Sequence, residues 1–134
     1  MNKTRIGIVG AGGRMGRMLI EACLKDEQLS LGALFDTTGS LVIGKTAGEL
    51  VGMASDVVVT DDLAAGLKDI DCLIDFTRPQ GTLHHLELCR QAGVGIIIGT
   101  TGFEAEGKEA IAAAAKDIPI VFAPNMAVGV NLVF

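Results

Sequence analysis

The fold of this chain is decided by residues 6–36, which read IGIVGAGGRMGRMLIEACLKDEQLSLGALFD. Ile6–Val9 is a short apolar run, typical of a strand that is buried on both faces. Arg14–Lys25 carries its apolar residues three or four positions apart, which predicts an amphipathic helix lying on a sheet. Leu29–Phe35 predicts a second strand, which ends at Asp36. The segment therefore predicts one strand–helix–strand unit.

The remainder of the chain continues this alternation. We expect helices near Ala47–Val51, Asp61–Leu67, Pro79–Ala92 and Glu104–Asp117, and strands at Val57–Val59, Cys72–Phe76, Gly95–Ile98 and Ile118–Phe122. Strands that alternate with helices form parallel sheets, because each right-handed crossover places a helix on one face. The expected fold class is α/β, with a doubly wound, mainly parallel sheet and helices on both faces.

The composition argues against several classes of protein. The chain has 134 residues, of which 49% are hydrophobic and 20% charged, as suits one globular domain rather than a disordered chain. The net charge is −5 and no Lys/Arg cluster alternates with aromatic residues, so nucleic-acid binding has little support. There is no signal peptide and no apolar stretch of about 18 residues, so we expect a soluble, cytoplasmic protein. The cysteines lack a metal-binding spacing and are expected to be reduced and buried: Cys23, Cys72 and Cys89.

The turn between the first strand and the first helix, Gly10–Gly16, is rich in glycine. Glycines at such a turn allow a sharp bend, a close approach of the backbone to a pyrophosphate, and tight helix–sheet packing. The start of the helix then offers free N–H groups to the phosphates. The spacing is G-x-x-G-x-x-G at Gly10, Gly13 and Gly16, because Met15 occupies the last position of the stricter G-x-G-x-x-G motif. The motif alone is also typical of a tight turn that binds no ligand.

Asp36 supports the dinucleotide interpretation. It directly follows the second strand and lies 26 residues after Gly10, close to the ~20 residues expected for a ribose-binding acid. A carboxylate there accepts hydrogen bonds from the adenosine ribose. The alternative role is a solvated loop acid or a cap for the following segment. In this context we interpret residues 6–36 as a dinucleotide-binding unit of the Rossmann type.

Small or hydrogen-bonding residues also follow the later strands, at Thr77-Arg78, Gly99–Gly102 and Ala123–Met126. Ligands of open α/β sheets bind beyond the carboxyl ends of the strands. These loops, together with Gly10 and Asp36, are therefore expected to line one cofactor trench. Each Thr has the alternative role of a helix N-cap.

The histidines carry no clear sign of chemistry. His84 and His85 lie inside the helix predicted at Pro79–Ala92, with no Cys or carboxylate spaced to complete a metal site. We expect both to be surface or packing residues, and we expect no metal. No Ser lies in a G-x-S-x-G elbow, so a serine hydrolase is not indicated either.

With these residues assembled, the chain resembles the amino-terminal domain of the 4-hydroxy-tetrahydrodipicolinate reductase family, also called dihydrodipicolinate reductase. The resemblance runs from Arg5 to Phe134 and rests on four ordered motifs: GAGGRMGR at 10–17, DFTRP at 75–79, GTTGF at 99–103 and NMAVGV at 125–130. The family uses NADH or NADPH to reduce its cyclic substrate on the route to diaminopimelate and lysine.

The resemblance implies cofactor-binding roles for residues in each loop. The pyrophosphate would be bound by Gly10, Ala11, Gly12, Gly13, Arg14 and Met15, and the adenosine ribose by Asp36. The nicotinamide end would be bordered by Thr77, Gly99, Thr100, Thr101, Ala123, Pro124, Asn125 and Met126. Members that accept NADPH often carry Arg directly after the ribose acid, where this chain has Thr37, so NADH is the expected preference. Arg14, Arg17 or Lys45 could still reach a 2′-phosphate, which leaves NADPH use open.

The second domain of the family is missing from this sequence. Its catalytic His and Lys lie in a His-His-Arg-His-Lys segment, followed by a Ser-Gly-Thr substrate loop, and neither occurs here. We therefore expect a dinucleotide-binding domain at 1–127, the start of a connector at 128–134, no catalytic residue in this chain, and cofactor binding without turnover. For the full-length protein the resemblance implies a small-molecule substrate and a homotetramer assembled through the second domain. The alternatives are the cofactor domain of another two-domain dehydrogenase and a nucleotide-sensing regulatory domain.

Overall fold

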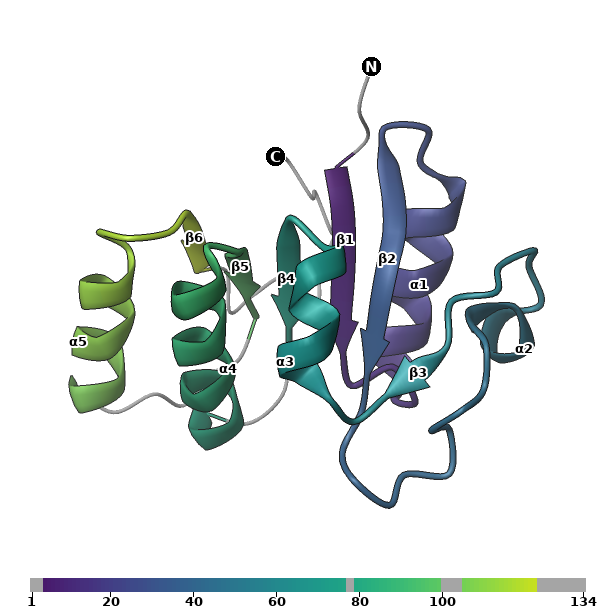
Figure 1. The fold of residues 1–134 in the computed structure, drawn as a ribbon, viewed down its shortest axis with the longest axis horizontal. Helices are drawn as coiled ribbons and strands as arrows, with labels where there is room; N and C mark the ends of the chain where they lie inside the picture. Colours follow the sequence, from purple (N-terminus) through teal and green to yellow (C-terminus); the bar gives the residue numbers. More distant parts are fainter. Residues whose placement is uncertain (1–3, 77–78, 100–104, 123–134) are drawn as a thin grey trace.

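The computed structural model describes residues 4–76, 79–99 and 105–122. Within these ranges, strands and helices alternate along the chain (Figure 1). The elements are β1 (Thr4–Val9), α1 (Arg14–Lys25), β2 (Leu29–Phe35), α2 (Ala47–Val51), β3 (Val59–Thr60), α3 (Leu63–Gly66), the 3₁₀ turn η1 (Leu67–Asp69), β4 (Cys72–Asp75), α4 (Pro79–Ala92), β5 (Gly95–Ile98), α5 (Ala105–Ala114) and β6 (Ile120–Phe122).

The strands of the described residues form one parallel sheet in the order β3-β2-β1-β4-β5-β6. The chain adds strands outward from β1 on one side and then returns past β1 to build the other side. Val9, the last residue of β1, pairs with Phe35 of β2 and with Asp75 of β4. The carboxyl ends of these strands therefore lie level where the strand order reverses, which is where open α/β sheets bind ligands. The doubly wound α/β fold predicted from the sequence is confirmed.

Alternate strand residues pack against opposite faces of the sheet, as the two-residue period of a strand requires. On one face Ile8 of β1 belongs to the same buried cluster as Ile20 of α1. On the other face Val9 of β1 belongs to the same cluster as Leu86 of α4 and Ile111 of α5. In Figure 1, α4 and α5 accordingly lie in front of the sheet and α1 lies behind it.

The three cysteines are free thiols, with Cys23 and Cys89 buried and Cys72 half-buried. Burial raises the pKa of the Cys23 thiol to about 11 and the pKa values of Cys72 and Cys89 to about 12. All three thiols therefore stay protonated at neutral pH, which makes them poor nucleophiles. The prediction that they are reduced, small apolar side chains is confirmed, although Cys72 is less buried than expected.

The strand predicted at Val57–Val59 forms two residues later, as β3 (Val59–Thr60). Residues just before β3 are paired elsewhere: Thr46 bridges Val58 in antiparallel fashion, and the Ala47 N–H donates to the Val57 carbonyl. The prediction of extended chain at Val57–Val59 is therefore confirmed, but Val57 and Val58 pair with residues 46–47 and not with β2.

Two predicted helices are shorter in the structure. The helix predicted at Asp61–Leu67 begins at Leu63, because the Asp62 side chain caps it by accepting from the Ala65 N–H at 3.1 Å. After Gly66 the chain continues as the 3₁₀ turn η1. The one predicted at Glu104–Asp117 ends at Ala114, after which the Asp117 N–H donates to a carbonyl three residues back. No helix in the described ranges is both long and apolar enough to cross a membrane.

Candidate dinucleotide-binding site

The glycine turn after β1 is held by the strand beside it. Gly10 has φ +83°, in the left-handed region that favours glycine. Its N–H and that of Ala11 both donate to the Phe35 carbonyl at the end of β2, at 2.9 and 3.0 Å. The Gly13 N–H donates back to the Gly10 carbonyl at 3.0 Å, which closes the turn. The bend from β1 into α1 is therefore fixed by backbone hydrogen bonds.

The helix that follows this turn begins without a side-chain cap, because its N-cap residue is Gly13. The first N–H groups of a helix lack intrahelical partners and attract anions together with the helix dipole. Ala11 is fully buried and Met15 packs against the core, whereas Arg14 is exposed at the start of α1. Backbone groups and Arg14, rather than the Ala11 or Met15 side chains, are thus suited to meet a phosphate.

The glycines of the turn differ in how much room they leave for a side chain. A Cβ on Gly16 would lie 2.1 Å from the Gly10 carbonyl oxygen, so α1 could not pack against the turn. A Cβ on Gly12 would lie 2.7 Å from Asp36 Oδ2 and 2.9 Å from a methyl group of Val42. A Cβ on Gly13 would meet only the Gly10 carbonyl oxygen, at 3.4 Å, within the described residues. The protein itself therefore has room for a side chain at Gly13 but not at Gly12 or Gly16.

Asp36 is hydrogen-bonded directly to the glycine turn. Its Oδ2 accepts from the Gly12 N–H at 2.9 Å and from Ser40 Oγ at 3.2 Å, and its Oδ1 accepts from the Thr37 N–H at 2.8 Å. The carboxylate is half-buried at the carboxyl end of β2. Two features that the sequence analysis assigned to one site, 24 residues apart in the chain, are thus brought into contact.

A cavity of about 1010 Å³ opens beside Asp36 at the carboxyl ends of β1, β2 and β4. Its walls come from these strand ends and from α3 and α4: Val9, Gly10, Phe35, Asp36, Thr37, Thr38, Asp61, Asp62, Leu63, Ala64, Phe76, Gly81, His84, His85 and Leu88. Of the predicted site residues, Gly10 and Asp36 line it directly. Its mixture of apolar walls and a few polar groups is typical of a small-molecule site.

The α4 wall of this cavity contains a contact that the sequence analysis missed. His84 is exposed, as expected, but His85 is half-buried and its Nδ1 lies 2.6 Å from Oδ2 of the fully buried Asp75. The expectation that both histidines are only surface or packing residues therefore does not hold for His85. A signal was present, because Asp75 ends a strand and His85 lies one turn into the helix that folds back over it.

Several predicted site residues lie outside the described ranges: Thr77, Thr100, Thr101, Ala123, Pro124, Asn125 and Met126. Gly99, which is described, is buried at the end of β5 and its N–H donates to the Asp75 carbonyl at 2.8 Å. A Cβ on Gly99 would lie 2.0 Å from the Phe76 ring, so the end of β5 packs tightly against the residue that follows β4.

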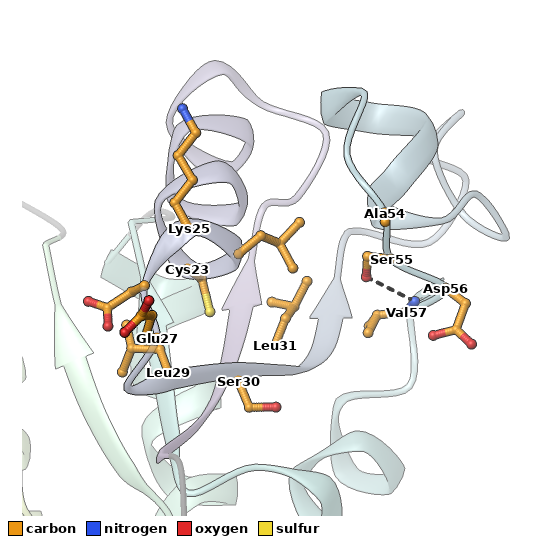
Figure 2. A pocket seen from close by; sticks show the side chains of 12 residues that line it. Cys23, Lys25, Glu27, Leu29, Ser30, Leu31, Ala54, Ser55, Asp56 and Val57 are labelled. Atoms are coloured by element: carbon orange, nitrogen blue, oxygen red, sulfur yellow. Dashed lines mark hydrogen bonds between the residues drawn. The ribbon is translucent and has the colours of Figure 1, made fainter.

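A second cavity, of about 420 Å³, lies at the opposite end of β2 (Figure 2). It is lined by the end of α1, the start of β2 and residues 54–57, and its charged side chains do not converge: Lys25 and Asp56 lie at opposite ends of it. Cys23 on its wall is a protonated thiol, because burial raises its pKa to about 11. This cavity contains neither the glycine turn nor Asp36, so it is not the candidate site.

The parallel sheet places the chain in the Rossmann-type class of α/β proteins, and an uncapped glycine turn at the switch point with an acid bonded to it is typical of dinucleotide-binding members of that class. The sequence model of one family, described as dihydrodipicolinate reductase, N-terminus, matches residues 4–126. The chain belongs to this family. The four-motif resemblance is thereby confirmed, and the two alternative classes of protein are set aside.

Known proteins of this kind match closely. The chain is 78% identical, over all of its length and 50% of the relative, to the 4-hydroxy-tetrahydrodipicolinate reductase of Dechloromonas aromatica (strain RCB). It is 62% identical to that of Aromatoleum aromaticum, over 97% of the chain and 47% of the relative. A solved structure, dipicolinate-bound dihydrodipicolinate reductase from Paenisporosarcina sp. TG-14, aligns with a TM-score of 0.76 and 28% identity over 96% of this chain and 49% of that one. The chain thus spans about half the length of these relatives.

We expect substitution of Gly13 and Gly16 by Ala to separate binding from stability. Gly16→Ala should lower the free energy of unfolding by about 1–3 kcal/mol, the usual cost of forcing extra atoms into a packed region. Gly13→Ala should leave stability within about 0.5 kcal/mol but weaken NADH binding several-fold, because the added methyl group would lie where the pyrophosphate approaches. Urea unfolding and NADH fluorescence titration measure the two effects. Equal NADH affinity of Gly13→Ala and the unsubstituted chain would contradict the assignment.

Proposed function

We propose that this chain binds a nicotinamide dinucleotide and forms the cofactor half of a reductase that converts 4-hydroxy-tetrahydrodipicolinate to tetrahydrodipicolinate in diaminopimelate and lysine biosynthesis. Family membership supports the reaction. The observation that carries the cofactor role is the hydrogen bond between the Gly12 N–H and Asp36, which joins a phosphate-binding turn to a ribose-binding acid.

The glycine turn and α1 bind the pyrophosphate in this proposal. The turn from Gly10 to Met15 surrounds the pyrophosphate. The N–H groups of Gly10 to Gly13 already have acceptors within the protein, so the N–H groups of Arg14 and Met15 and the positive end of the α1 dipole are the ones offered to the phosphates, and Gly13 leaves room for close approach. Arg14, which is exposed at the helix start, adds a charge that can pair with a phosphate oxygen.

Asp36 binds the adenosine ribose. Its carboxylate is oriented by the Gly12 and Thr37 N–H groups and by Ser40, so little reorganisation is needed when ribose hydroxyls bind. Between Asp36 and α4, the apolar side chains of Leu63 and Leu88 offer walls for the adenine ring.

The nicotinamide end lies beyond β4, β5 and β6 in this proposal. Gly99 borders it from the end of β5, and the tight contact of this residue with Phe76 leaves no room for a side chain. The other contacts are assigned from the family resemblance to Thr77, Thr100, Thr101, Ala123, Pro124, Asn125 and Met126. The bound cofactor supplies a hydride to the substrate, and the residues of this chain hold and orient it.

NADH is the preferred cofactor in this proposal. A 2′-phosphate would stand against Asp36, whose carboxylate is fixed in place, and Asp61 and Asp62 add negative charge to the same cavity. The phosphate and these carboxylates would repel each other, and the neutral Thr37 provides no positive charge to offset that repulsion. The positively charged side chains that could pair with the 2′-phosphate of NADPH are Arg14, Arg17 and Lys45.

A comparison of cofactors tests this preference. We expect the chain to bind NADH at least about tenfold more tightly than NADPH, a difference of about 1.4 kcal/mol. Asp36→Ala should weaken NADH binding by a similar factor and reduce the discrimination to a few-fold. Asp56→Ala removes the same charge at the cavity of Figure 2 and serves as the matched control. Tighter binding of NADPH by the unsubstituted chain would refute the preference.

The proposed reaction also needs the half of the protein that this chain does not contain. The catalytic His and Lys, the substrate loop and the contacts of a homotetramer are assigned, by family resemblance, to a second domain that follows residues 1–127 and the connector at 128–134. Cytoplasmic localisation is part of the same proposal, as expected for a biosynthetic enzyme.

The isolated chain should therefore bind NADH and yet reduce no substrate. Incubation with NADH and 4-hydroxy-tetrahydrodipicolinate should leave the NADH absorbance unchanged, while a fluorescence titration in the same buffer shows that NADH is bound. The full-length relative from Dechloromonas aromatica provides the positive control. Sustained oxidation of NADH by the 134 residues alone would show that catalytic groups are present in this half.

A further inference from the structure

The cavity wall opposite Asp36 contains a histidine held by a buried acid. His85 of α4 lines the cavity together with Gly10, and its side chain keeps 18% of its surface exposed. Its Nδ1 lies 2.6 Å from Oδ2 of Asp75, whose side chain is fully buried at the end of β4. The neighbouring His84 is exposed and lines the same cavity, and no hydrogen bond of its ring is seen among the described residues.

The Asp75 carboxylate fixes how His85 presents its ring. A buried carboxylate is costly unless hydrogen bonds compensate it, and a short bond to an imidazole N–H provides part of that compensation. With Nδ1–H donating to Asp75, the ring takes one tautomer and one orientation, in the manner of a carboxylate that orients a histidine for a metal or a substrate. The opposite ring nitrogen, Nε2, is the one left to act in the cavity.

The strand register places this ring across from the phosphate-binding turn. Asp75 pairs with Val9, which directly precedes Gly10, so the end of β4 and the start of the glycine turn are neighbours. On the far side of β1, Val9 pairs with Phe35, which directly precedes Asp36. A dinucleotide that lies over the end of β1, between Asp36 and α4, would thus pass in front of His85.

We propose that His85 binds the adenosine-diphosphate half of the dinucleotide through Nε2, and that Asp75 is the positioning residue that orients the ring. This inference rests on the proposed cofactor site. It assigns to α4 a specific polar contact, in addition to the apolar wall formed by Leu88. The partner of Nε2 is a phosphate oxygen or a ribose hydroxyl, both of which ADP contains.

Two substitutions at one position separate this role from a structural one. His85→Asn places an amide N–H near the position of Nδ1 and so keeps a donor for Asp75, but it removes Nε2. His85→Gln places its amide near Nε2 and removes the donor to Asp75. Gln91→Asn is the control, because Gln91 is an exposed residue of the same helix and does not line the cavity. Affinities for NADH, ADP and nicotinamide mononucleotide are measured by fluorescence and calorimetry, and stability by thermal unfolding.

We expect His85→Asn to weaken the binding of both NADH and ADP about tenfold, in line with a lost hydrogen bond to a charged group. Its melting temperature should stay close to that of the unsubstituted chain, and binding of nicotinamide mononucleotide should be unaffected. His85→Gln should lose stability and retain more affinity for ADP than His85→Asn does. Gln91→Asn should behave like the unsubstituted chain. Unchanged affinity of a folded His85→Asn variant for ADP would overturn the proposal.

The imidazole nitrogen spectrum of the unsubstituted chain gives a second readout that needs no variant of His85. Addition of ADP should shift Nε2 of His85 more than the ring nitrogens of His84, and Asp75→Asn should alter the tautomer signature of His85. Binding of ADP without any shift of His85 Nε2 would also overturn the proposal. If neither NADH nor ADP binds the unsubstituted chain, the proposed cofactor function fails as well, and the two failures are thereby distinguished.

Discussion

The hydrogen bond from the Gly12 N–H to Asp36 Oδ2 connects the two halves of the strand–helix–strand unit at the point where a ligand would lie. It acts together with the Phe35 carbonyl, which accepts from both Gly10 and Ala11, so the end of β2 holds the turn after β1. The carboxylate in turn is fixed by Ser40 and by the Thr37 N–H. In the proposed function a cofactor would find these groups already in position. The contact between Gly12 and Asp36 needs the absence of a Cβ at Gly12.

The glycines of this turn show how one motif can combine folding and binding requirements. Gly10 needs a left-handed backbone, Gly16 allows α1 to pack on the turn, and Gly12 makes room for Asp36. Gly13 is the exception, because the protein leaves space for a side chain there. In the proposed cofactor site, the space beside Gly13 at the uncapped start of α1 would be taken by the pyrophosphate.

Much of the fold and part of the site could be predicted from the sequence, because they follow from local patterns. The βαβ unit could be predicted from the apolar run Ile6–Val9, the apolar spacing in Arg14–Lys25 and the position of Asp36. The alternation of strands with helices along the chain predicted the parallel sheet. The position of β3 was not predictable in this way, since its neighbouring residues pair with a segment some dozen residues earlier in the chain. The Asp75–His85 contact was also not predicted, because it does not follow a metal-ligand spacing: it joins the end of a strand to the second turn of the next helix.

The central claim is that the glycine turn and Asp36 act as one cofactor site, and a double-mutant cycle on NADH binding tests it most directly. Gly12→Ala would place a methyl group against Asp36 Oδ2 and against Val42, and Asp36→Ala would remove the carboxylate. Residues in direct contact show coupling energies of about 0.5–3 kcal/mol in such cycles. We expect Gly12→Ala to weaken NADH binding strongly in the unsubstituted chain and less in the Asp36→Ala background, where only the contact with Val42 remains. Strictly additive losses in the two backgrounds would contradict it.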